Sequence, residues 1–174
     1  MKLDPLEPVI PDLASPDFDR DVQQYEKVRH TRRFAWMLSL ASAVPLAVLV
    51  LLIAALEPVH PIRPLLLSAL ATYGAVLLSF LGGIRWGLAM GARKQESTRR
   101  IFAMSVAPVL VGWFSLMLPV PHLFAVQLLA FAGQGAWDSL AGQASAFGLW
   151  FVRLRTIMTL LVCALLAMAF FLTV

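Results

Sequence analysis

Long apolar blocks, separated by short polar or proline-rich segments, dominate the sequence from residue 34 onward. They cover about residues 34–56, 65–91, 101–118, 123–137 and 156–174. A transmembrane helix needs about 20 mostly apolar residues, and helices satisfy their own backbone groups in lipid. Only 14% of the 174 residues are charged, compared with about a quarter in soluble domains. The sequence therefore predicts an all-α, polytopic membrane protein with five transmembrane helices.

The fourth block is short and ends at Asp138. The following residues, 139–150, are too few to cross a bilayer and too apolar for an ordinary loop. They either extend the fourth helix or lie in the membrane interface, and the sequence leaves both alternatives open.

Basic residues alternate along the segments that flank the apolar blocks. Four Lys or Arg residues lie at 27–33, directly before the first block, one follows that block, four lie before the third, none before the fourth, two before the fifth and none after it. Because basic loops stay in the cytoplasm, this alternation predicts an N-terminus inside and a C-terminus outside. Residues 1–33 resemble neither a signal peptide nor an acid-poor transit peptide, which favours a multi-pass protein of the bacterial inner membrane.

Residues 1–33 are polar, and we expect them to form a cytoplasmic extension before the transmembrane domain at 34–174. Ser15 and Pro16, followed by several acids, are typical of a helix start. One apolar stripe then repeats at three- and four-residue spacing, at Phe18, Val22, Tyr25 and Val28. This pattern predicts an amphipathic helix over about 16–30 that docks on a partner or lies on the membrane. A solvated lead-in to the first span is the alternative.

Small residues recur at every fourth position of the second block, at Ala71, Ala75, Ser79, Gly83, Gly87 and Gly91. Residues four apart share a helix face, and glycine lets another backbone approach closely in lipid. We therefore expect a helix-packing face from Ala75 to Gly91, with its partner either in this chain or in another.

Arg85 lies about 200° around the helix from Gly83, so it is not on that face. Its side chain either extends to the cytoplasmic headgroups, meeting anionic lipid, or pairs with a carboxylate. Asp138 is the only acid after Glu96 and is the candidate for this pair. Arg153 and Arg155 compete for it.

Two segments resemble motifs of a known family. Tyr73 and the segment SFLGGIRWG at 79–87, with Gly82, Arg85 and Trp86, match the first motif. The segment WFVRLRTIMT at 150–159, with Trp150, Arg153 and Arg155, matches the second. The family is catalogued as domain of unknown function 3429 and includes the mitochondrial transmembrane protein 69, and the resemblance covers roughly residues 34–165.

The family also has an acid where Asp138 stands, whereas Phe151 replaces an expected Tyr. The resemblance implies a small multi-span inner-membrane protein and no established activity.

The sequence contains no phosphate-binding loop, nucleophile elbow, paired carboxylates or metal-ligand cluster. We therefore expect neither an enzyme nor a cofactor, and the positive charge is explained by lipid headgroups rather than nucleic acid. The favoured function is a non-catalytic accessory or assembly subunit of a larger inner-membrane complex, bioenergetic by analogy with the mitochondrial relative. The alternative is a small carrier or channel for a neutral or lipid-like solute, in which Pro45, Pro108 and the glycines line a cavity.

Overall fold

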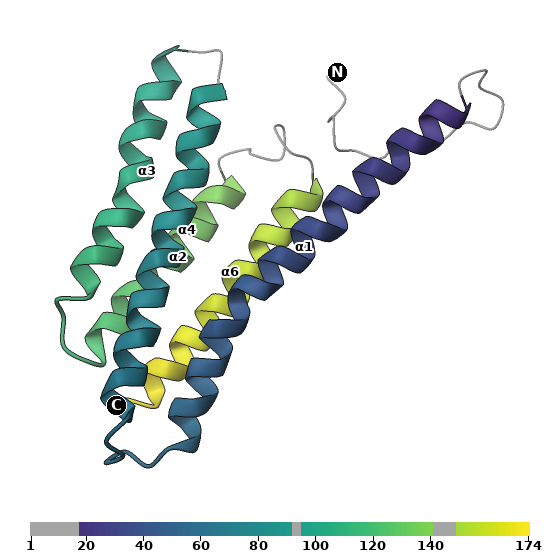
Figure 1. Cartoon of the computed structure of the whole chain (residues 1–174). Helices are drawn as coiled ribbons and strands as arrows, with labels where there is room; N and C mark the ends of the chain where they lie inside the picture. Colours follow the sequence, from purple (N-terminus) through teal and green to yellow (C-terminus); the bar gives the residue numbers. More distant parts are fainter. Residues whose placement is uncertain (1–17, 92–94, 141–148) are drawn as a thin grey trace.

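The computed structural model describes residues 18–91, 95–140 and 149–174 (Figure 1). Five α-helices and no strand occur in these ranges, which confirms the all-α class. The helices are α1 (Phe18–Ala55), α2 (Arg63–Gly91), α3 (Gln95–Ser115), α4 (His122–Leu140) and α6 (Leu149–Phe171).

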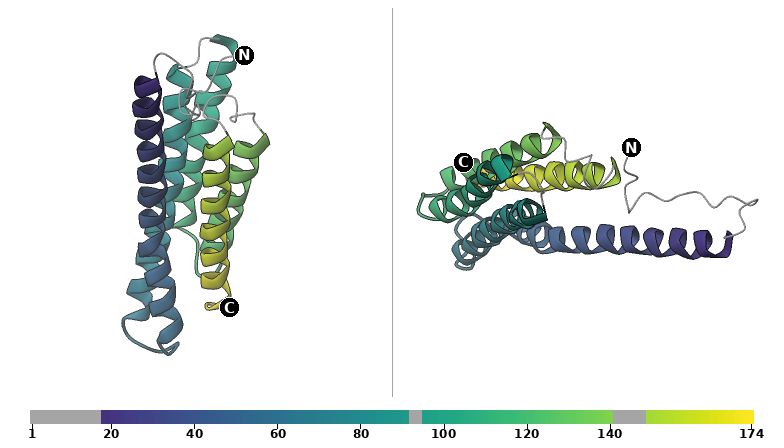
Figure 2. Two further views of the ribbon diagram at one scale, coloured as in Figure 1. Left: turned by 90° about the vertical axis from the view of Figure 1, so that its right-hand side faces the viewer. Right: turned by 90° about the horizontal axis from the view of Figure 1, so that it is seen from above.

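α2 is the central helix of the bundle, because it packs against α1, α3 and α4. α6 packs against α4 and α1, so that α1 and α3 lie on opposite sides of the bundle (Figure 1). The N-terminal part of α1 extends beyond the other helices (Figures 1 and 2). The C-terminus of the chain lies beside the connection between α1 and α2.

Three helical segments are long and apolar enough to cross a membrane: Glu26–Ala55, Arg63–Gly87 and Trp150–Phe171. In their most apolar windows only 22%, 33% and 22% of the residues, respectively, are buried inside the protein. An apolar surface of this extent needs an apolar solvent, since large exposed apolar patches are rare on soluble monomers. These segments indicate a membrane protein.

The first helix differs from the prediction, because α1 passes through residues 33 and 34 without a break. The expected amphipathic helix and the first span are therefore one helix. No Gly or Pro interrupts the junction, and the Thr31 hydroxyl donates a hydrogen bond to the carbonyl of Lys27 one turn earlier, at 2.9 Å. α3 also begins earlier than expected, at Gln95 rather than near residue 101, and so includes part of the polar segment before the third apolar block.

α2 and α4 begin and end within three residues of the predicted blocks, whereas α6 begins seven residues before the predicted start near residue 156. α4 continues to Leu140 and α6 begins at Leu149, so both helices take up part of the segment 139–150. The rest of that segment, 141–148, lies outside the described residues.

The tightly packed core lies in one half of the bundle, toward the α1–α2 connection. It is built from the second half of α1, the first halves of α2 and α4, and the second half of α6. Its completely buried side chains include Leu46, Ile53, Leu70, Phe124 and Leu166. The other half of the bundle carries most of the described arginines, including Arg32, Arg33, Arg153 and Arg155, and is called the basic end below.

Arg63 joins three helices at the end opposite the basic end. It is the first residue of α2, and only 9% of it is exposed. Its guanidinium donates hydrogen bonds to the carbonyls of Ile53 and Leu56 near the end of α1, at 3.5 and 2.9 Å, and to Leu172 after α6, at 2.6 Å. Carbonyls at a helix C-terminus lack helical partners and carry partial negative charge, so they stabilise this cation.

Candidate functional site

The residues of the first motif segment lie on three different sides of α2, whereas the second segment is on α6. One side contacts α3, a second encloses Arg85 against α4, and a third faces a cavity between α1 and α6. These sides decide which residues are available to a ligand or partner.

Gly82 and Gly112 allow α2 and α3 to approach closely. A methyl group at Gly82 would overlap the backbone carbonyl oxygen of Ser105 and touch Val109. A methyl group at Gly112 would lie 3.1 Å from the carbonyl oxygen of Ala75. The closest backbone contacts of α2 are therefore made at Ala75 and Gly82, two helical turns apart.

The expected packing face is buried at Ala75 but exposed at Gly83 and Gly87. Ala75 is buried against α3, and the Ser79 hydroxyl donates to the carbonyl of Ala75 at 2.9 Å. Gly83 and Gly87 are exposed, and a methyl group at either would meet no atom within 4 Å. Gly91 is the last residue of α2, and its surroundings lie outside the described part.

Helix geometry explains why no described part of this chain packs closely on Gly83 and Gly87. At about 100° per residue, each step of four residues turns the helix by about 40° beyond a full circle. Gly83 is therefore about 80° from Ala75, whereas Gly82 is only about 20° away. The face of α2 that contacts α3 therefore follows a seven-residue spacing. The small residues at every fourth position turn progressively away from this face.

Arg85 is inside the bundle, with only 4% of the residue exposed. One guanidinium nitrogen, Nη2, lies 3.4 Å from the carbonyl oxygen of Gln134 on α4, and the guanidinium carbon lies 5.5 Å from the ring centroid of Trp137. This burial argues against the interpretation in which Arg85 reaches lipid headgroups. The side chain of Asp138 lies outside the described residues, so the pair with Asp138 stays a prediction.

A shallow hollow of about 230 Å³ lies beside Arg85. Gln134 and Trp137 of α4 and Met104 and Pro108 of α3 contribute to its lining. The guanidinium thus has an amide and an aromatic ring as neighbours in this hollow.

Two other motif residues join helices. The Tyr73 hydroxyl donates a 2.7 Å hydrogen bond to the carbonyl of Ser42, three residues before Pro45 of α1. Trp86 packs edge-on against Phe102 of α3, with ring centroids 4.7 Å apart, and nearly half of Trp86 is exposed. Tyr73 therefore ties α2 to α1, and Trp86 ties α2 to α3.

A cavity of about 250 Å³ lies between α1, α2 and α6, and both motif segments line it. α2 contributes Leu81 and Ile84 of the first segment, and α6 contributes Trp150 and Arg155 of the second. Arg32 of α1 stands over Trp150, 5.3 Å from the ring centroid. Sequence reasoning missed this arrangement, because apolar residues such as Leu81 and Ile84 gave no sign of which helix they face.

The remaining predicted site residues lie on α6 and α1. Arg153 is exposed and Arg155 is half-buried at the basic end. In the expected docking stripe of α1, Val28 is buried and Val22 half-buried, whereas the side chains of Phe18 and Tyr25 lie outside the described residues. No group of three His, Cys, Asp or Glu that could hold a metal occurs in the part of the chain that is described.

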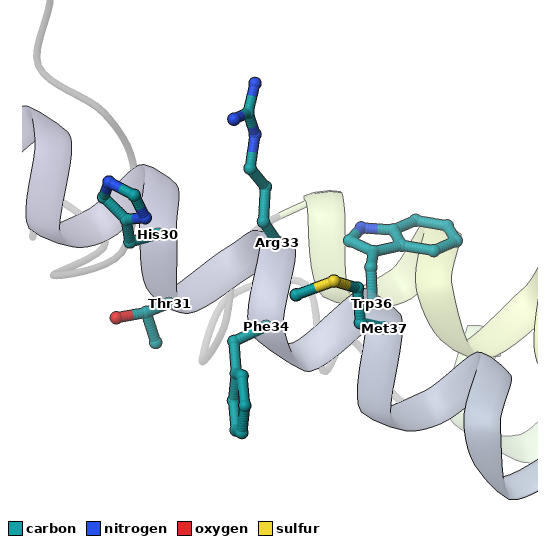
Figure 3. A pocket seen from close by; sticks show the side chains of 6 residues that line it. All are labelled: His30, Thr31, Arg33, Phe34, Trp36 and Met37. Atoms are coloured by element: carbon teal, nitrogen blue, oxygen red, sulfur yellow. The ribbon is translucent and has the colours of Figure 1, made fainter.

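A larger hollow, of about 820 Å³, lies along the N-terminal part of α1, but every residue that lines it belongs to this one helix. Figure 3 shows that these side chains point in different directions from the helix axis, His30 and Arg33 to one side and Phe34 to the other. No second described helix lines this hollow. We therefore take the cavity between α1, α2 and α6 as the candidate site.

Comparison with known proteins agrees with the resemblance of the two motif segments. The model of a family described as "Protein of unknown function (DUF3429)" matches residues 31–171, which include all of the motif residues named above. No solved structure matches the chain significantly.

Proposed function

The chain belongs to the DUF3429 family of proteins of unknown function, and from this premise we propose that it is a non-catalytic accessory or assembly subunit of a larger membrane complex. In this proposal the complex is bioenergetic and lies in the bacterial inner membrane. The subunit crosses the bilayer five times and acts through helix packing and lipid contact.

One exposed face of α2 carries this proposal. Five exposed residues follow one another at alternating steps of four and three along this face, and we call them the outer stripe: Val76, Phe80, Gly83, Gly87 and Met90. This 3.5-residue period is the spacing at which a second helix packs along a helix face. Two exposed glycines stand between large apolar residues, and in lipid glycines on a helix face let a partner helix approach closely and gain van der Waals contacts. The outer stripe therefore supports docking of a helix from another protein.

Gly87→Leu tests this function. The new side chain would meet no described atom of this chain, and it would occupy the space that a partner helix needs. We expect the chain to fold normally and its retention of the partner complex to fall by roughly tenfold, which corresponds to about 1.4 kcal/mol of interface energy. Partners are measured by purification from native membranes in mild detergent, with a photo-crosslinker in place of the exposed Met90 of the outer stripe to identify the contact.

The matched control is Gly133→Leu, since Gly133 of α4 is also exposed with no atom within 4 Å of an added methyl group. Retention of the same partner by both variants would contradict docking on the outer stripe.

The proposed topology places the basic end in the cytoplasm. Supporting it, the opposite end carries Arg63, whose charge is engaged by helix carbonyls. We expect a periplasmic reporter fused after Val174 to be active and a cytoplasmic reporter at the same position to be silent. Activity of the cytoplasmic reporter would rule out five spans with the N-terminus inside.

A second candidate function is a carrier for a neutral or lipid-like solute, and the cavity between α1, α2 and α6 favours it. A carrier would purify alone or as a homo-oligomer, whereas an accessory subunit comigrates with its complex. The same purification therefore separates the two functions.

A further inference from the structure

The cavity between α1, α2 and α6 combines an apolar interior with a basic entrance. Its deeper lining is apolar and includes Ala43, Leu77, Phe131 and Val162. Trp150 and Arg155 line it at the start of α6, where Arg32 contacts Trp150 from α1. The cavity thus changes from charged to apolar along the axis of the bundle.

The cavity opens sideways onto the apolar surface of the bundle. Leu38 of α1 and Phe80 of α2 both line it, yet 62% and 64% of these residues are exposed. In a membrane this surface faces acyl chains. An occupant can therefore enter directly from the bilayer.

The size of the cavity suits a single chain. Its volume of about 250 Å³ lies below the ~300–1,000 Å³ typical of sites that enclose a drug-sized ligand. It would hold roughly eight groups the size of a water molecule, at about 30 Å³ each. Part of one acyl chain fits this space, whereas a whole lipid does not.

The entrance favours an anion. Arg33 and Arg153 are exposed and lie within one helical turn of the Arg32–Trp150 contact, so both helices carry basic residues near the entrance. Among the described side chains of α1 and α6, Glu26 is the only acid, and it lies six residues before Arg32. The indole N–H of Trp150 is buried and has no hydrogen-bond acceptor in the described structure. A phosphate or ester oxygen would accept from this donor.

We propose that this cavity binds one anionic phospholipid of the surrounding bilayer, with part of an acyl chain inside and the phosphate at the entrance formed by Arg32, Trp150 and Arg155. The site does not depend on the proposed accessory function, since both an assembly subunit and a carrier can hold a lipid at a fixed position.

Native mass spectrometry of the purified full chain tests the site, with phosphatidylglycerol and phosphatidylcholine of identical chains as probes. We expect one phosphatidylglycerol to bind about tenfold more tightly than phosphatidylcholine, because α1 and α6 both carry arginines at the entrance. Ser39→Phe fills the cavity and should lower this affinity by about tenfold. Ala41→Phe, at an exposed position of the same helix, should leave it unchanged.

The entrance is tested separately. Arg155→Gln should weaken phosphatidylglycerol binding by about fivefold and leave phosphatidylcholine binding unchanged. If Arg155→Gln does not fold, Trp150→Phe is used instead. This variant should weaken binding of phosphatidylglycerol, because it removes the indole N–H donor. Equal binding of the two lipids, equal effects of Ser39→Phe and Ala41→Phe, or a neutral lipid such as a quinone retained from the native membrane would overturn the proposal.

Discussion

Gly82→Ala is expected to destabilise the protein by about 2 kcal/mol, although alanine is the better helix former by about 1 kcal/mol. The added methyl group would overlap the carbonyl oxygen of Ser105, which is part of the α3 backbone and cannot rotate away. α2 and α3 must therefore separate, which weakens the packing between them. Thermal unfolding in detergent, followed by circular dichroism, measures the change.

Gly83→Ala is the matched control, because it makes the same chemical change one residue later in the same helix. No atom lies within 4 Å of the added methyl group, so stability should stay the same or rise by up to about 1 kcal/mol. Equal losses for the two variants would mean that Gly82 is not the point of close approach.

Arg63→Gln is expected to cost about 3 kcal/mol, because the shorter, neutral side chain cannot reach both α1 and α6. The wild-type guanidinium donates to three carbonyls, and hydrogen bonds to charged groups contribute about 1.5–3 kcal/mol each before the cost of burying the charge is subtracted. Arg63→Lys should lose less, since it keeps the charge but not the planar fork that serves two helices. Unfolding in detergent gives the total loss.

A local measurement distinguishes the loss of the Arg63 hydrogen bonds from general destabilisation. Amide hydrogen exchange at the last turn of α6 should increase in Arg63→Gln before the rest of the bundle is affected, because Leu172 loses its contact with α2. Arg153→Gln, at an exposed site, should change stability by less than about 0.5 kcal/mol. If Arg63→Gln lowers stability no more than this control, the hydrogen bonds of Arg63 do not contribute to stability.

Family membership and the all-α class could be predicted from the sequence, because both depend on local information. Each motif segment, at 79–87 and at 150–159, is contiguous in sequence, and the apolar blocks are recognised by their length and composition. The structure confirms three segments that are long and apolar enough to span a membrane. The sequence predicted separate helices over about 16–30 and 34–56, whereas α1 is continuous, since a change from polar to apolar residues alters the solvent of a helix but not its backbone hydrogen bonds.

The candidate site could be predicted only in part. Arg85 was singled out, but its burial beside Gln134 depends on how α4 packs. The role of Arg63 depends on two chain ends that are 109 residues apart in sequence. The cavity was not foreseen, since it needs α1, α2 and α6 to meet at particular rotations about their axes.

The sequence by itself determined that this chain forms long apolar helices and which family it belongs to. Only the tertiary structure decided that Gly82 and not Gly83 meets α3, that Arg63 joins α1 to α6, and that the two motif segments share a cavity. The physical reason is that a soluble helix shows its inner face by being apolar on one side. A helix in lipid is apolar on all sides, so its rotation and its partners are set by close packing that the sequence pattern does not display.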